Sequence, residues 1–121
     1  MQERRQGDRY AISMPIRVKW KDDAGNVVVE EGLTENVGTQ GTLIYLPRKL
    51  PSVGAKVDLT VTEHADDEVS VTAQVIRLER NAAHPQVALM LTEGLRVWKK
   101  KVWEYAAETI AGQEPDEFED W

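Results

Sequence analysis

An alternation of apolar and polar side chains, with a period of two, constrains this chain more than any other feature. Between Ile12 and Trp20 every second residue is apolar, and polar residues or proline fill the positions between them. This pattern is typical of a strand that buries one face. It recurs, with interruptions, in short segments that are separated by turn-forming residues. The segments predicted to be strands are residues 11–20, 27–37, 41–47, 57–62, 68–80 and 86–93.

Six short strands without intervening helices favour a small antiparallel β-barrel, because closure removes the edges that an open sheet exposes. Two features predict local irregularities. Pro15 indicates a sheet edge or a bulge, and the apolar phase slips at Ile76 and Leu78, as a bulge or a bend requires. The predicted fold class is therefore all-β, a six-stranded antiparallel barrel, followed by a helix.

The helix is predicted because the apolar period lengthens to three and four residues from Glu93 onward. Residues 94–112 should form an amphipathic α-helix, with the run Lys99–Lys101 largely turned to solvent. Its apolar face, which includes Trp98, should pack against the barrel. We expect one domain with four parts: a flexible arginine-bearing arm (1–10), the barrel (11–93), the helix (94–112) and an acidic, disordered tail (113–121).

Composition and charge exclude several classes of function. The 121 residues include no cysteine, so neither a disulfide framework nor a thiolate nucleophile is expected. The formal net charge of −6 argues against a general DNA or RNA binder. No apolar run reaches the roughly 18 residues of a membrane span, and no signal-peptide core follows the charged N-terminus. We therefore expect a cytoplasmic protein without membrane insertion.

Catalysis is not predicted either. The sequence offers no Ser-His-acid grouping, no glycine-rich phosphate loop and no metal constellation, so we expect no enzyme and no cofactor. His64 with Asp66, Asp67 and Glu68 superficially suggests a metal site. Four polar residues are ordinary in a hairpin loop, however, and no second ligand cluster accompanies them.

The N-terminal arm carries the first functional signal. Arg4, Arg5 and Arg9 lie within the first ten residues, and Arg5 and Arg9 form an R-x-x-x-R pair on a polar, flexible segment that contains Gly7. A guanidinium can meet guanine O6 and N7 with two hydrogen bonds, grip a phosphate, or stack on a base. The pair is therefore suited to a planar, anionic ligand. A solvated terminus without a ligand is the alternative reading.

The second signal lies between the second and third predicted strands, where the sequence reads Asn36-Val37-Gly38-Thr39-Gln40-Gly41. With R-x-x-x-R ahead of it, this segment resembles the PilZ domain family, the bacterial receptors for cyclic di-GMP, whose second motif is [D/N]-x-S-x-x-G. Asn36 and Gly41 match that motif, whereas Gly38 stands where the family has serine. The strand order, the Leu-Pro-x-Val-Gly step at residues 50–54 and the closing helix are also similar to the family.

The resemblance implies a role for each matching residue. Arg5 and Arg9 would wrap the ligand, Asn36 would hydrogen-bond a guanine edge, and Gly41 would let the main chain approach the ligand. Arg4 would be an auxiliary phosphate contact. The chain is thus expected to be a non-catalytic cyclic di-GMP receptor that signals to an unidentified protein partner when the arm becomes ordered.

Gly38 leaves an alternative open. Loss of the serine hydroxyl removes one hydrogen bond, about 0.5–1.5 kcal/mol, unless Thr39 or a water replaces it. A PilZ-like protein–protein adaptor with weak or no nucleotide binding is therefore the second hypothesis. A small-barrel RNA binder is the third, and the net charge and the lack of a basic aromatic face argue against it.

The tail supports one further hypothesis. Residues 114–121 carry five carboxylate side chains, no base, and the aromatic residues Phe118 and Trp121. The proposed nucleotide is also anionic and aromatic, so the tail can compete with it for the arginine arm. A solubilising tail and a partner-binding motif are the alternatives.

Overall fold

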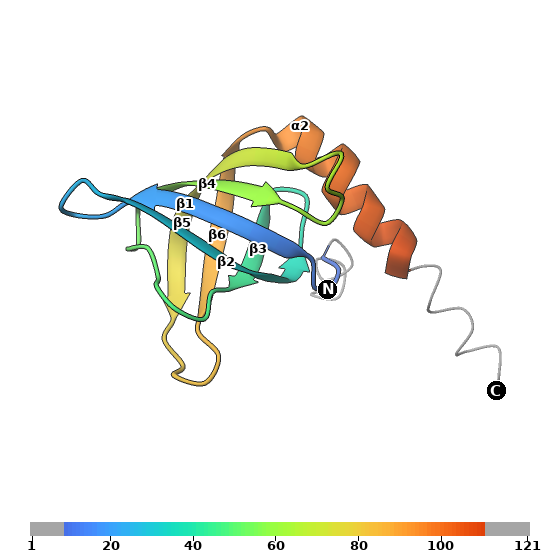
Figure 1. Cartoon of the computed structure of the whole chain (residues 1–121). Helices are drawn as coiled ribbons and strands as arrows, with labels where there is room; N and C mark the ends of the chain where they lie inside the picture. The colour runs from blue at the N-terminus through green and yellow to red at the C-terminus, as the bar shows by residue number, and fades with distance from the viewer. Residues whose placement is uncertain (1–8, 111–121) are drawn as a thin grey trace.

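The computed structural model describes residues 9–110, which form a barrel of six strands and a C-terminal helix (Figure 1). Its regular elements are β1 (Pro15–Lys21), β2 (Val27–Val37), β3 (Gly41–Tyr45), β4 (Lys56–Val61), β5 (Val69–Glu79), β6 (Gln86–Glu93), α2 (Leu95–Trp98) and η1 (Lys99–Trp103), and helical residues continue from 104 to 110.

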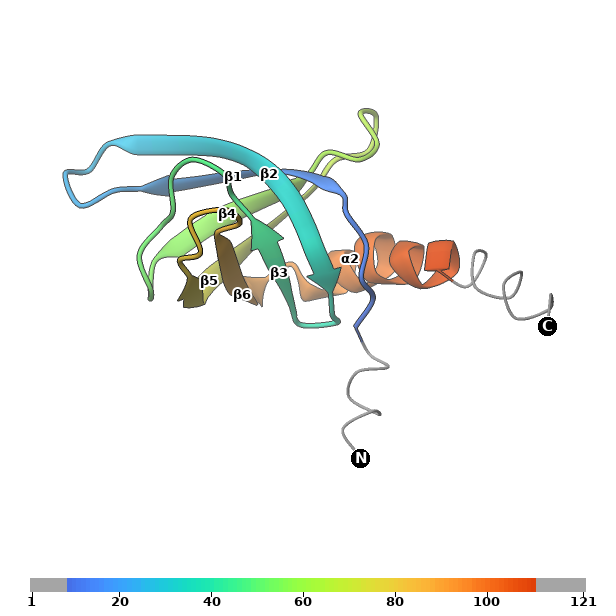
Figure 2. The ribbon, with the colours of Figure 1, turned by 90° about the horizontal axis from the view of Figure 1, so that it is seen from below.

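The strands close into a barrel in the order β1-β2-β3-β6-β5-β4, and every neighbouring pair is antiparallel. Figure 2 shows the sheet curving around its interior, with the helix alongside. The predicted fold class, an all-β six-stranded barrel with a C-terminal helix, is confirmed. The four-part division of the chain at residues 10, 93 and 112 stays a prediction.

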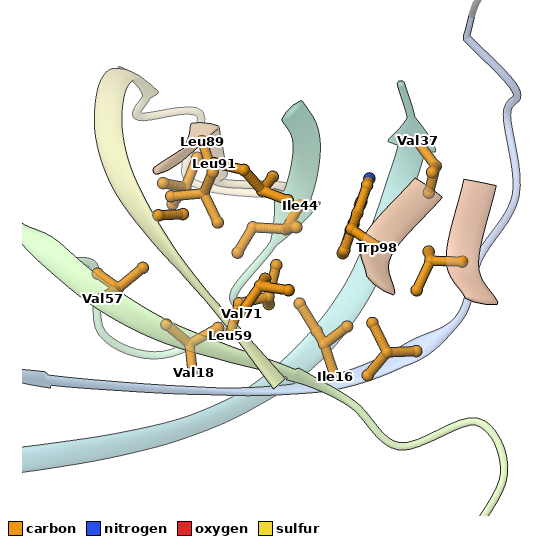
Figure 3. Close-up of a cluster of buried hydrophobic side chains, with 14 of the residues drawn as sticks. Ile16, Val18, Val37, Ile44, Val57, Leu59, Val71, Leu89, Leu91 and Trp98 are labelled. Atoms are coloured by element: carbon orange, nitrogen blue, oxygen red, sulfur yellow. The ribbon is translucent and has the colours of Figure 1, made fainter. Parts of the chain in front are cut away.

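The interior is filled by the apolar residues of the alternating pattern. Ile16, Val18 and Trp20 point inward from β1 and are 1%, 0% and 6% exposed, as the period of two requires. Inward-facing aliphatic residues of the other strands complete the core, together with Trp98 from the helix (Figure 3). β1 itself begins at Pro15, later than the alternation suggested, and proline is well tolerated at the first position of a strand.

One irregularity in the ladder lies where the apolar phase breaks. The β5–β6 register shifts between Val75 and Arg77, so the bulge expected from the slip at Ile76 is present. It leaves Ile76 on the outer surface, 47% exposed. Two further shifts, between Thr34 and Asn36 in β2 and between Thr72 and Ala73 in β5, had no signal in the alternation.

The C-terminal helix follows Gly94, whose φ of 85° lies in the left-handed region that glycine tolerates. The run Lys99–Lys101 is exposed, as predicted, while Trp98, Val102 and Ala106 are buried. The predicted amphipathic helix is present, but its residues Lys99–Trp103 are π-helical where an α-helix was expected. Apolar residues spaced three and four apart predict a helix but do not indicate that one of its turns is π-helical.

The β4–β5 hairpin loop packs against this helix. Lys101 Nζ lies 2.8 and 2.9 Å from the two carboxylate oxygens of Asp67, and the His64 ring meets the Tyr105 ring edge-on with centroids 5.1 Å apart. The His64 loop therefore has a packing role. Between residues 9 and 110, no group of three potential ligands could hold a metal ion, and no helix combines the length and apolar composition of a membrane span.

Candidate functional site

The turn that joins β2 to β3 is held by its own hydrogen bonds and by one from a distant strand. Gly38 N–H donates to Gly41 O at 2.8 Å, and Leu91 N–H of β6 donates to Gln40 O at 2.9 Å. The hydroxyl of Thr42 donates to Asn36 O at 2.6 Å, just after the register shift in β2. These bonds fix the backbone on both sides of the turn, so its shape depends on the barrel around it.

The described end of the N-terminal arm docks on this turn. Tyr10 pairs with Val37 through two backbone hydrogen bonds of 3.0 and 2.9 Å. This bridge places Arg9 over the end of β2, where its Nη1 donates to Asn36 Oδ1 at 2.6 Å, across 27 residues of sequence. The second arginine of the R-x-x-x-R pair and the asparagine of the strand motif therefore meet directly.

Gly38 and Gly41 are close together but tolerate a side chain differently. A Cβ at Gly38 would lie 3.4 Å from Arg9 Cγ, Arg9 Cζ and Gly41 O, so a small side chain fits beneath the arginine. A Cβ at Gly41 would lie only 2.6 Å from Leu89 O on β6. The barrel itself thus requires glycine at position 41, a cause that the sequence did not reveal.

A hollow of about 310 Å³ opens beside the arginine on the outer face of the barrel. Its lining residues are Arg9, Gly38, Thr39, Gln40, Gly41, Ile76, Leu89 and Met90. Ile76 and Met90 are 47% and 45% exposed and give it an apolar wall. Sequence reasoning did not select these two residues, although the phase slip at Ile76 was the signal that an apolar side chain turns outward there.

Four of the six predicted site residues are thus gathered at one place, namely Arg9, Asn36, Gly38 and Gly41. Arg4 and Arg5 lie outside the described residues. Two larger hollows, of about 500 and 630 Å³, lie along β1 and β4 and share Lys19 and Asp58. They contain none of the predicted residues, so size alone does not identify the site.

Comparison with known proteins identifies the family. Residues 3–102 match the sequence model of the PilZ domain, which is most of the chain. The chain belongs to the PilZ domain family. No curated protein matches it in sequence.

Solved structures share the fold of this PilZ domain at low sequence identity. The PilZ domain of CeSA from a cellulose-synthesising bacterium is 19% identical, with a TM-score of 0.52. The match covers 88% of this chain and 97% of that domain. The PilZ domain of YcgR from Escherichia coli, solved with c-di-GMP, is 13% identical, with a TM-score of 0.54 and coverage of 93% and 92%.

A larger relative is also similar in fold. The inhibitor of motility MotI/DgrA from Bacillus subtilis is 14% identical, with a TM-score of 0.64 over 88% of this chain. This chain spans only 50% of that protein. At such identities the likeness is one of fold.

Proposed function

We propose that this PilZ domain is a non-catalytic receptor for cyclic di-GMP and that the nucleotide binds at the hollow beside Arg9. The hydrogen bond between Arg9 and Asn36 carries the proposal, because it joins the two halves of the family motif at one point on the barrel. The c-di-GMP in the structure of the YcgR PilZ domain supports the choice of ligand.

The chemistry of the hollow suits a guanine nucleotide. A guanidinium can form two hydrogen bonds to guanine O6 and N7, and an amide can donate to and accept from a base edge. Ile76 and Met90 offer an apolar surface for the face of a base. Arg4 and Arg5 would join from the arm as phosphate and guanine contacts.

Affinity should be modest for two reasons. Asn36 Oδ1 already accepts a hydrogen bond from Arg9, so a ligand that uses this oxygen exchanges one bond for another. Gly38 also lacks the hydroxyl that the family has at this position, which costs up to about tenfold in affinity.

Signal output is the remaining part of the proposal. Arg9 and Tyr10 of the arginine-bearing arm, residues 1–10, already dock on the barrel. Binding would bring Arg4 and Arg5 against the barrel as well and create a surface for a protein partner. A cytoplasmic location stays a prediction, and the sequence names no partner.

Isothermal titration of the purified protein with cyclic di-GMP tests the receptor. We expect saturable binding in the micromolar range and none with GMP. The Arg5→Ala/Arg9→Ala variant should lose about 100-fold or more, since each bidentate arginine contact contributes roughly 1–3 kcal/mol.

The matched control is Arg48→Ala, which removes a positive charge from an arginine whose side chain is 80% exposed and outside the hollow. It should bind as the wild type does. Absence of heat at high protein concentration, with no thermal shift, would reject the receptor and leave the protein–protein adaptor.

A further inference from the structure

We infer that the C-terminal helix is part of the nucleotide site, with Trp98 as a positioning residue that fixes the Gly38 turn. The inference rests on the proposed function and names a residue outside both family motifs. It follows from two contacts between the helix and the segments that carry those motifs, and from the geometry of the helix at those contacts.

The first contact is a hydrogen bond from Trp98 to the turn. Trp98 Nε1–H donates to Gly38 O at 2.8 Å, across 60 residues of sequence, and the tryptophan is 0% exposed. Figure 3 shows the Trp98 side chain beside the end of β2 at Val37. A buried carbonyl that loses its donor is costly, so the helix and the turn stabilise each other.

This bond matters more because the turn residue is glycine. Glycine has more backbone freedom than any other residue, so an unrestrained Gly38 would have to be ordered when a ligand binds. Here its N–H donates to Gly41 O and its C=O accepts from Trp98, so both backbone groups are held. The helix thus restrains the backbone at position 38, where this chain has glycine in place of the family's serine.

The second contact reaches the arm. The rings of Tyr10 and Trp103 have centroids 5.6 Å apart, and Tyr10 precedes the barrel immediately after Arg9. Because Tyr10 also pairs with Val37, the helix side chain and the end of β2 together hold the residue next to the motif arginine.

The third observation is the π-helical segment Lys99–Trp103, which lies between the two tryptophan contacts. Residues five apart point about 140° away from each other on a regular α-helix, so Trp98 and Trp103 would face different surroundings. A turn with i→i+5 hydrogen bonds brings such residues toward one face. The π-helical turn therefore allows one helix to contact both the turn and the arm.

A consequence of these contacts is thermodynamic linkage. If ligand binding requires the turn in this conformation, any change that undocks the helix weakens binding, and the ligand strengthens helix docking by the same factor. The C-terminal helix is then an element through which a partner can sense the nucleotide.

The test without ligand uses Trp98→Phe, which keeps an aromatic ring but removes the N–H donor. Trp20→Phe is the matched control, since Trp20 is 6% exposed in β1 and does not line the hollow beside Arg9. We expect amide hydrogen exchange at Gly38 to rise about fivefold or more in Trp98→Phe relative to Trp20→Phe, as loss of one buried hydrogen bond predicts. Equal exchange in the two variants would overturn the inference.

The test with ligand is a double-mutant cycle. Trp98→Phe should weaken cyclic di-GMP binding about five- to tenfold in the native Gly38 background. It should weaken binding less in the Gly38→Ser background, where the side chain restricts the turn. Equal losses in both backgrounds would show that Trp98 does not compensate for Gly38.

The two tests separate this inference from the proposed function. If the wild type does not bind cyclic di-GMP, the receptor proposal fails. Exchange at Gly38 then decides whether Trp98 holds the turn: faster exchange supports that role and unchanged exchange removes it.

Discussion

Two turns of the barrel, each connecting antiparallel neighbours, differ in whether distant segments of the chain also hold them. The β1–β2 turn is held by itself: Asp22 Oδ1 accepts from Ala24 N at 3.0 Å and from Asn26 N at 2.8 Å, and Gly25 has a φ of 86°. The β2–β3 turn also has a bond of its own, from Gly38 N–H to Gly41 O, but it is held in addition from elsewhere, by Trp98 and, through Asn36, by Arg9.

The difference distinguishes a turn that only connects two strands from a turn whose shape can respond to changes elsewhere in the protein. A turn that satisfies its own hydrogen bonds keeps its shape whatever happens elsewhere in the protein. A turn held by the arm and the helix changes whenever either of them moves, and its shape is then linked to both. Changes at the first turn should therefore alter stability alone, whereas changes at the second should alter ligand binding.

The largest effect is expected from a matched pair of glycine substitutions. Gly41→Ala would put a Cβ 2.6 Å from Leu89 O, so β3 or β6 must shift, at a cost of about 1–3 kcal/mol. Gly25→Ala meets no atom within 4 Å but forces alanine to a positive φ, at about 1–2 kcal/mol.

Urea unfolding and titration with cyclic di-GMP distinguish the two variants. Both should lower the free energy of unfolding, but only Gly41→Ala should also weaken nucleotide binding. A Gly25→Ala variant that loses affinity as well would break the comparison between the turns.

A second pair of substitutions should separate the effect on stability from the effect on nucleotide affinity. Asp22→Ala removes the acceptor for two backbone N–H groups and should lower the free energy of unfolding by about 0.5–1.5 kcal/mol, with affinity unchanged. Asn36→Ala should leave stability nearly unchanged and weaken nucleotide binding by about 1–3 kcal/mol. Chemical denaturation beside titration calorimetry measures both, and an Asn36→Ala variant with native affinity would remove Asn36 from the site.

The same contrast explains what the sequence could predict. The strands follow from alternation, and the β1–β2 turn follows from the run of turn formers at residues 21–26, because both depend on neighbours in the chain. The break in the apolar alternation at Ile76 likewise predicted a bulge. These are local properties, and the structure bears them out.

Residues of the candidate site could be predicted only where they match a family motif. Asn36 and Gly41 were chosen through the resemblance, yet the contact that makes Gly41 necessary comes from Leu89. Trp98 was expected to pack against the barrel, which it does, but its bond to Gly38 spans 60 residues. No local pattern contains such a contact, nor the π-helical turn between Trp98 and Trp103.

A smaller effect is expected from Gly38→Ser, which restores the family's motif. The added Cβ makes only 3.4 Å contacts with Arg9 and Gly41, so the substitution should fold normally. We expect cyclic di-GMP binding to become up to about tenfold tighter, through one new hydrogen bond. Gly38→Ala is the control for the hydroxyl, and a serine variant that binds no better than alanine would assign no hydrogen bond to that position.

The smallest effect concerns the acidic tail, which lies outside the described residues. If residues 114–121 compete with the nucleotide for the arginines, their removal should tighten binding about two- to fivefold at low salt and less at 0.15 M, where the Debye length is about 8 Å. A full-length variant with the five carboxylates changed to amides should reproduce the gain, which separates charge from length.

The position of the helix makes this competition geometrically reasonable. Trp103 contacts Tyr10, and the last described helical residue, 110, is seven residues further on, about 10 Å along a helix axis. Both views show the end of the helix on the same side of the barrel as the start of the described chain (Figures 1 and 2). Affinity that is unchanged or weaker after truncation would exclude competition between the tail and the nucleotide.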